Sequence, residues 1–78
     1  MKKIVITEFM DESAVDALRN SFKVVYDPKL VHDTHRLMSS VTDADAVIVR
    51  NRTQMRGDLL AACAQATVIG RLGVGLDN

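Results

Sequence analysis

The sequence lacks several features that define common classes of protein. Its single cysteine, Cys63, excludes an internal disulfide and fits a reducing, cytoplasmic compartment. Its 10 lysines and arginines balance 10 aspartates and glutamates, so no net charge attracts nucleic acid or an anionic membrane surface. We therefore expect neither nucleic acid nor a membrane among its partners.

Long apolar runs are also missing. The start, MKKIVITEF, has the two lysines of a signal peptide, but its apolar run is interrupted at Glu8 after only a few residues. We interpret it as a strand, and no stretch is long enough to span a membrane. With 78 residues, of which 47% are hydrophobic, the composition is that of one small globular domain.

What the sequence does contain is four short apolar segments that predict β-strands. Uninterrupted apolar runs are typical of parallel strands buried on both faces of a sheet. The predicted strands cover residues 3–7, 23–26, 46–49 and 67–70.

Three stretches between the strands show helical periodicity. Asp11 is a capping residue for the first, the second covers about residues 33–41, and the third covers about residues 56–64, where Gly57 weakens the first turn. The apolar faces are Val15, Leu18 and Phe22 in the first, Leu37, Met38 and Val41 in the second, and Leu59, Leu60 and Cys63 in the third.

Strands that alternate with helices indicate right-handed crossovers and a parallel sheet. The simplest strand order is 2-1-3-4, which places the strand at 23–26 on an edge. The sequence therefore predicts an α/β fold. A fifth strand would normally follow, so we also expect the chain to be a fragment of a longer protein.

Polar residues follow two neighbouring strands of this sheet. Arg50, Asn51 and Arg52 come directly after the strand at 46–49, and Arg71 ends its neighbour. Ligands of open α/β sheets bind beyond the carboxyl ends of the strands, and guanidinium groups bind carboxylate, phosphate or sulfonate in a forked geometry. The pattern predicts a site for a small anion. The alternative is that these arginines only neutralise helix carboxylates.

The loop Gly73-Val74-Gly75 allows more than one interpretation. A dinucleotide fingerprint would place its third glycine at position 78, which is Asn78, so nucleotide binding is disfavoured. Two glycines around Val74 let backbone N–H groups approach a small anion closely. The other interpretation is a plain turn.

His32 and His35 are spaced like a pair of metal ligands. Zinc sites need three or four ligands and no further one is placed near them, so we interpret both as part of a solvated helix start. Cys63 lies on an apolar helical pattern, which indicates a small buried hydrophobe rather than a nucleophile.

At VIVRNRT and again at VIGRLGVGLDN the sequence resembles the N-terminal part of the D-isomer-specific 2-hydroxyacid dehydrogenases, especially the phosphoglycerate, hydroxypyruvate and sulfolactate dehydrogenases. The resemblance runs from the first strand to Asn78. It implies a flavodoxin-like three-layer substrate-binding domain that closes over a Rossmann domain. The intact enzyme would be a homodimer that uses NAD or NADP to oxidise a small D-2-hydroxy acid or to reduce its 2-keto partner.

The resemblance also implies roles for the candidate site residues. The N–H groups of Val74 and Gly75 would hold the substrate carboxylate, and Arg50, Asn51 and Arg52 would reach the distal end of the substrate. Arg71 and Gly73 complete the predicted substrate-binding set.

The family's hydride-transfer machinery and its glycine-rich NAD loop lie beyond the position of Asn78. Residues 1–78 would thus be the N-terminal part of the substrate-binding domain, without the dinucleotide-binding domain. We expect no catalytic, cofactor-binding or metal-binding residue in this chain, and no activity from it alone.

A different class of protein is the alternative, namely a free-standing flavodoxin-like binding or signalling module such as a response-regulator receiver. Receivers have an acidic pair after the first strand and an aspartate at the end of the third. This chain has Thr7-Glu8 and Arg50 at those places, which favours an acidic ligand over a phosphoacceptor with magnesium.

Overall fold

The computed structural model describes residues 2–50, 53, 57–63 and 65–71. Its sheet contains β1 (Lys3–Ile6), β2 (Lys23–Tyr26), β3 (Ala46–Val49) and β4 (Val68–Arg71) in the order β2-β1-β3-β4. Every neighbouring pair is parallel. The predicted α/β fold, its strand order and the edge position of β2 are confirmed, with strand bounds that differ from the prediction by one residue at most.

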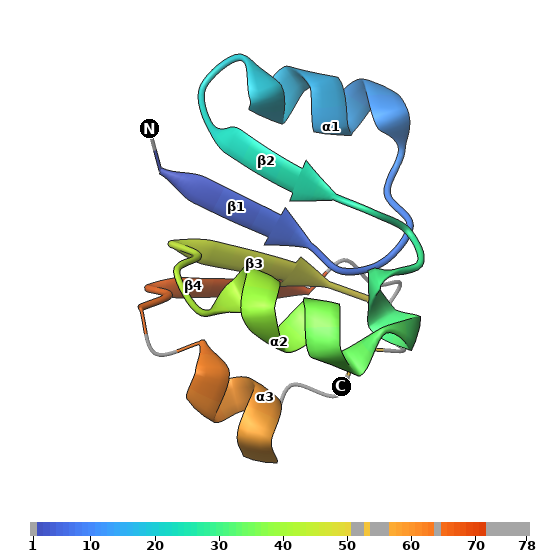
Figure 1. Cartoon of the computed structure of the whole chain (residues 1–78). Helices are drawn as coiled ribbons and strands as arrows, with labels where there is room; N and C mark the ends of the chain where they lie inside the picture. Colours follow the sequence, from blue (N-terminus) through green and yellow to red (C-terminus); the bar gives the residue numbers. More distant parts are fainter. Residues whose placement is uncertain (1, 51–52, 54–56, 64, 72–78) are drawn as a thin grey trace.

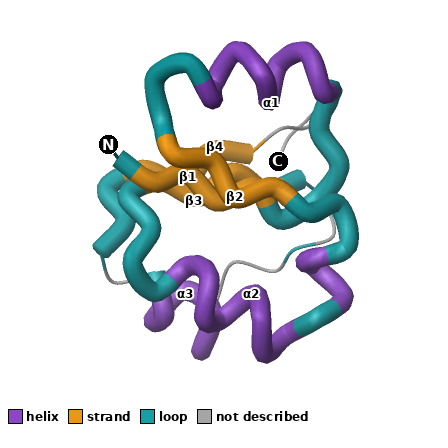
Figure 2. Tube along the Cα trace, turned by 45° about the horizontal axis from the view of Figure 1, so that its top comes forward, coloured by secondary structure: helices purple, strands orange, loops and turns teal. Residues whose placement is uncertain are grey.

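Helices cover both faces of the sheet. α1 (Glu12–Arg19) lies on one face, and α2 (Thr34–Val41) and α3 (Gly57–Ala62) lie on the other, which gives three layers (Figures 1 and 2). A 3-10 helix, η1 (Leu30–His32), connects β2 to α2. None of the helices in the described residues is long and apolar enough to cross a membrane.

Two of the helices begin at aspartate caps. The carboxylate of Asp11 accepts from the backbone N of Ser13 at 3.4 Å, and Asp33 Oδ1 accepts from the backbone N of Arg36 at 3.1 Å. These bonds satisfy N–H groups that have no partner inside the first turn of a helix. The capping role predicted for Asp11 is confirmed.

The central strands are apolar without interruption because they supply two cores. Successive side chains of a strand point to opposite faces. Val5, Val47 and Val49 are buried on the α2 and α3 side, whereas Ile4 and Ile6 are buried on the α1 side. Ala46 and Ile48 face the α1 side and are only half-buried, because α1 alone covers that face within the described residues.

The predicted core face of the third helix was partly wrong. Leu59 and Ala62 pack against the core and Cys63 is buried, but Leu60 is 48% exposed. Residues 59, 62 and 63 share one side of a helix, while residue 60 is turned about 100° from residue 59. Its described part runs from Gly57 to Ala62, and the predicted limits Arg56 and Ala64 lie outside the described residues.

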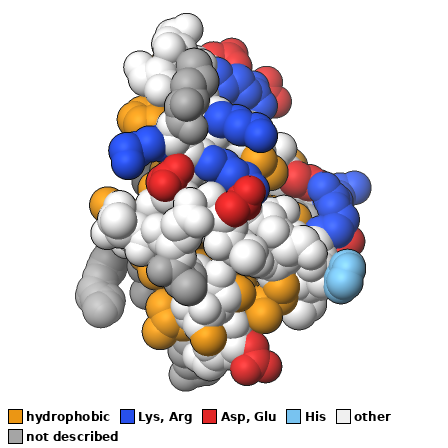
Figure 3. Space-filling view, turned by 60° about the vertical axis from the view of Figure 1, so that its left-hand side comes forward, with side chains coloured by type: hydrophobic (Ala, Val, Ile, Leu, Met, Phe, Trp, Pro, Cys, Tyr) orange, Lys and Arg blue, Asp and Glu red, His pale blue; other side chains and the backbone are white. Residues whose placement is uncertain are grey.

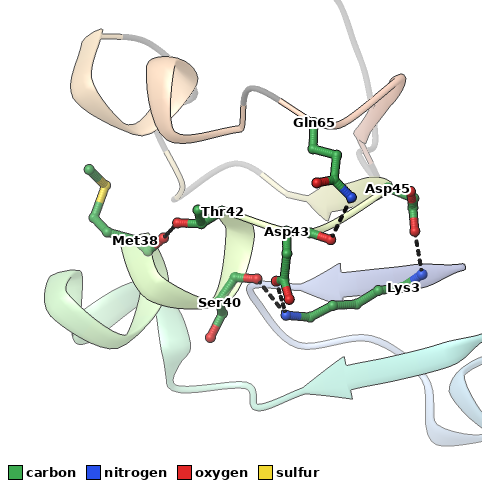
Figure 4. A network of polar contacts seen from close by, with 7 residues as sticks. All are labelled: Lys3, Met38, Ser40, Thr42, Asp43, Asp45 and Gln65. Atoms are coloured by element: carbon green, nitrogen blue, oxygen red, sulfur yellow. Dashed lines mark hydrogen bonds and ion pairs between the residues drawn. The ribbon is translucent and has the colours of Figure 1, made fainter.

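A polar network lies at the edge of the sheet where the strands begin. Lys3 Nζ donates to the Ser40 carbonyl at 2.9 Å and forms an ion pair with the Asp43 carboxylate (Figure 4). The backbone N of Lys3 donates to Asp45 Oδ2 at 2.8 Å, and Gln65 Nε2 donates to the Asp43 carbonyl at 3.3 Å. Figure 3 shows this side of the molecule, with basic and acidic side chains next to one another.

Candidate functional site

The predicted site lies where the strands end, opposite the polar network of Lys3. Because the strands are parallel, their carboxyl ends lie on one edge, and the register places Val49 of β3 beside Arg71 of β4. Arg50 follows β3 directly, so the two strand ends that the sequence predicted to be neighbours are neighbours in the backbone. Arg71 is described by its backbone, and five other candidates lie outside the described residues: Asn51, Arg52, Gly73, Val74 and Gly75.

Glu8 is a buried acidic side chain at this edge, and it is 4% exposed. Its Oε2 accepts from the backbone N of Arg50 at 2.8 Å and from the backbone N of Thr53 at 2.9 Å. Bonds from N–H groups to an ionised carboxylate are stronger than bonds between neutral groups. A single carboxylate oxygen thus ties the end of β1 to two points of the chain beyond β3.

Thr7 strengthens the same connection. Its Oγ1 lies 2.8 Å from Thr53 Oγ1, and its backbone N donates to the Ile48 carbonyl at 3.1 Å. The carbonyl of Thr7 accepts from the backbone N of Val31 at 3.0 Å. Both threonines are buried, and each hydroxyl has a hydrogen-bond partner, which avoids the cost of an unsatisfied buried polar group.

The side chain of Arg50 returns toward the end of β1. Its Nη1 donates to the Phe9 carbonyl at 3.3 Å, and the residue is half-buried. The ion pairs between described residues join Lys3 to Asp43, Arg19 to Asp16 and Arg36 to Asp27. Arg50 is therefore not neutralised by a carboxylate within the described part of the chain, which argues against the alternative of a purely charge-neutralising arginine.

The loop that follows β1 is fixed on its other side by Tyr26. The tyrosine hydroxyl donates to the Met10 carbonyl at 3.1 Å and accepts from the Met10 backbone N at 3.2 Å. The four residues Thr7 to Met10 consequently contact β2, η1, β3 and the chain after β3. Neither Thr7 nor Glu8 is assigned to the site from the sequence: Thr7 belongs to the first predicted strand, and Glu8 is the end of an apolar run and, with Thr7, a difference from receivers. The available signal was an acidic residue directly after a buried strand, on the edge where α/β proteins bind ligands.

The other candidates from the sequence lie away from this edge or inside the core. His32 is in η1 and His35 is in the first turn of α2, and both are exposed. No group of three His, Cys, Asp or Glu residues within the described ranges is placed to hold a metal ion. Cys63 is buried and burial raises the pKa of its thiol, which confirms it as a small core residue.

Comparisons with known proteins identify the family of the chain. The sequence model of the family described as D-isomer specific 2-hydroxyacid dehydrogenase, catalytic domain, matches residues 4–78. The chain is 49% identical over 78 residues to (S)-sulfolactate dehydrogenase of Chromohalobacter salexigens, of which it covers 25%. It is 33% identical over 78 residues to D-3-phosphoglycerate dehydrogenase of Methanocaldococcus jannaschii, covering 14% of that protein.

A third relative is D-3-phosphoglycerate dehydrogenase of Mycobacterium leprae, at 35% identity over 77 residues and 14% of that protein. All of this chain, or nearly all of it, takes part in these matches. It spans a quarter or less of the length of the curated relatives that it matches.

Proposed function

Since the chain belongs to the D-isomer specific 2-hydroxyacid dehydrogenase family, we propose that residues 1–78 form the N-terminal part of the substrate-binding domain of a longer oxidoreductase. That enzyme transfers hydride between NAD or NADP and carbon 2 of a small D-2-hydroxy acid. The hydride machinery belongs to a Rossmann domain outside this chain. We further propose that the enzyme is a cytoplasmic homodimer.

One observation carries the proposal for the substrate. Arg50 stands at the end of a central strand with its backbone N held by Glu8, and its guanidinium contacts a neutral carbonyl. A guanidinium has five N–H donors, and the contact with Phe9 uses one of them. The remaining donors suit an anionic group at this edge of the sheet.

The substrate that fits carries a second anionic or polar group besides its carboxylate. The relatives are named for sulfolactate and phosphoglycerate, which bear a sulfonate and a phosphate. We assign the distal group to Arg50, Asn51 and Arg52. The carboxylate is assigned to the loop of Arg71, Gly73, Val74 and Gly75, where the N–H groups of Val74 and Gly75 bind it.

Arg50→Ala in the full-length gene product tests this proposal. A lost charge-assisted bond is worth roughly 1.5–3 kcal/mol, so KM should rise about tenfold to a hundredfold with kcat little changed. Arg50→Lys should recover only part of the affinity because the charge remains and the fork is lost. Steady-state kinetics with sulfolactate and 3-phosphoglycerate, together with thermal midpoints, provide the measurement. An unchanged KM with a lowered midpoint would make Arg50 structural.

A titration of the 78-residue chain with NADH distinguishes the two classes of function. As part of a substrate-binding domain it should show no saturable binding of NADH in a fluorescence titration. A saturable signal at micromolar NADH would contradict the assignment and would favour the loop of Gly73 and Gly75 as a nucleotide site in a free-standing binding module.

A further inference from the structure

Glu8 is the only ionisable side chain among the buried residues of the described part, apart from the thiol of Cys63. Removing a carboxylate from water is costly unless hydrogen bonds compensate for the lost solvation. Two N–H groups provide such bonds here, and both belong to the chain segment that begins with Arg50. The partners lie 42 and 45 positions from Glu8 in the sequence, so the contact exists only in the folded chain.

The three consecutive residues Thr7, Glu8 and Phe9 contact Arg50 and Thr53 from several directions. Glu8 binds the backbone N of both, Phe9 binds the guanidinium of Arg50, and Thr7 binds the hydroxyl of Thr53. The backbone and the side chain of Arg50 are therefore oriented by adjacent residues at the end of β1. Glu8 provides the hydrogen bonds to the backbone.

We propose that Glu8 is a positioning residue of the anion site: its carboxylate holds the backbone of Arg50 and Thr53, and this places the Arg50 guanidinium for the substrate. The proposal rests on the proposed function in one respect, namely that Arg50 binds the substrate. The hydrogen bonds from the backbone of Arg50 and Thr53 to Glu8 are independent of that assignment.

A positioning role and a role through charge predict different effects for Glu8→Gln. An amide oxygen can accept the same two N–H bonds without the negative charge, so a positioning role predicts that Gln preserves the site. A role through the electric field of the carboxylate predicts tighter anion binding by Gln, because a negative charge near the anion is removed. Glu8→Asp keeps the charge but is one methylene shorter, so it should not reach both N–H groups.

Amide hydrogen exchange on the 78-residue chain tests the hold on the backbone without any substrate. In Glu8→Ala the amides of Arg50 and Thr53 should exchange at least tenfold faster, while that of Val47 changes less than about threefold. Glu8→Gln should stay within about threefold of the wild type at all three. The matched control is Glu12→Ala, which removes an exposed glutamate from the first turn of α1.

Two outcomes of the exchange experiment would overturn the proposal. One is equal acceleration at Val47, Arg50 and Thr53, which would make Glu8 a residue of general stability. The other is unchanged exchange at Arg50 and Thr53 in the alanine variant. If Glu8→Ala does not fold, Glu8→Asp replaces it, and selective acceleration at Arg50, at Thr53 or at both is then the expected result.

Kinetics of the full-length gene product test the link to the substrate. Glu8→Ala should raise KM about tenfold with kcat within about threefold of the wild type, and Glu8→Gln should restore most of the affinity. The double variant Glu8→Ala/Arg50→Ala should have the KM of Arg50→Ala, because Glu8 acts through Arg50.

The two kinds of failure are distinguishable. If Arg50→Ala leaves KM unchanged, the proposed function of Arg50 fails, and the exchange experiment still decides whether Glu8 holds the backbone. Additive effects of Glu8→Ala and Arg50→Ala on KM, or tighter binding by Glu8→Gln, would overturn the positioning role while leaving Arg50 in the site.

Discussion

Arg50 and Lys3 are both cations at strand ends, but the groups that their side chains contact differ. Lys3 forms an ion pair with Asp43, so its charge is compensated within the fold. Arg50 contacts the neutral carbonyl of Phe9, and no carboxylate of the described residues pairs with its guanidinium. A guanidinium that has no carboxylate partner among the described residues and lies at the carboxyl edge of a parallel sheet is suited to bind an anion, whereas the lysine at the opposite edge stabilises the fold.

Among the described residues, Gly57 is the glycine whose backbone conformation disfavours any other residue. Its φ is +60°, a region that other L-residues rarely adopt, although open space surrounds the position of an added Cβ. Gly57→Ala should therefore lower the free energy of unfolding by about 1 kcal/mol through backbone strain alone. Urea unfolding followed by circular dichroism measures the change.

Gly70→Ala is the matched control for Gly57. An added Cβ there also meets open space, but Gly70 does not have a positive φ. Its substitution should leave the stability unchanged or raise it by up to about 1 kcal/mol, because glycine in a strand interior carries an entropic penalty. Equal losses of stability for the two variants would show that the conformation of Gly57 is not the cause.

β1 is held at both of its ends by side-chain contacts, in addition to the backbone hydrogen bonds of the sheet. Its amino end is joined to the turn between α2 and β3 by Lys3, Asp43 and Asp45. Its carboxyl end is joined to the chain beyond β3 by Glu8. β1 is thereby bonded to the turn that precedes β3 and to the chain that follows it.

The ion pair at the amino end of β1 predicts a specific pH dependence of stability. The hydrogen bond from Lys3 is the main cause that lowers the pKa of Asp43 below its usual value of 3.8. The pKa of Asp27 is also lowered, chiefly by the N–H of Lys29. A lowered carboxyl pKa contributes stability above the unfolded pKa, and this contribution is lost as the pH falls through the folded value.

Unfolding free energies measured by urea titration should therefore fall as the pH drops below about 4. Asp43→Asn and Lys3→Met should each weaken this acid dependence by a similar amount, and the double variant should weaken it no further. An acid dependence that is unchanged in Asp43→Asn would show that the pair with Lys3 does not contribute to it.

The sheet is covered unevenly, and β4 is its more exposed side. Val68 and Ile69 of β4 are 59% and 41% exposed, and within the described residues no strand pairs with the outer edge of β4. Apolar side chains on an open strand edge favour pairing with another chain.

The 78-residue chain should consequently associate as its concentration rises. Sedimentation equilibrium at several concentrations measures this, and Val68→Lys should shift the chain toward the monomer. Leu60→Lys is the matched control, since Leu60 is 48% exposed on α3 rather than on the strand edge. A strict monomer at every concentration would contradict the prediction.

The sequence by itself determined the order of the elements, the parallel sheet and the place of Arg50 at a central strand end. These follow from local signals: uninterrupted apolar runs of strand length, helical periodicity between them, and polar residues where a run stops. Such signals depend on residues close together in the chain. They identified the buried role of Cys63, but they assigned Leu60 to the core because both faces of a short apolar helix look alike in sequence.

Only the tertiary structure decided what holds Arg50 in place. Glu8 and Arg50 are 42 positions apart, and Thr7 and Thr53 are 46 positions apart. The register of β1 on β3 brings them together, with Ile6 opposite Ile48, so that the residues following each strand meet at the same edge. A hydrogen bond acts only over about 3 Å, and no periodic pattern in the sequence specifies which distant groups come that close.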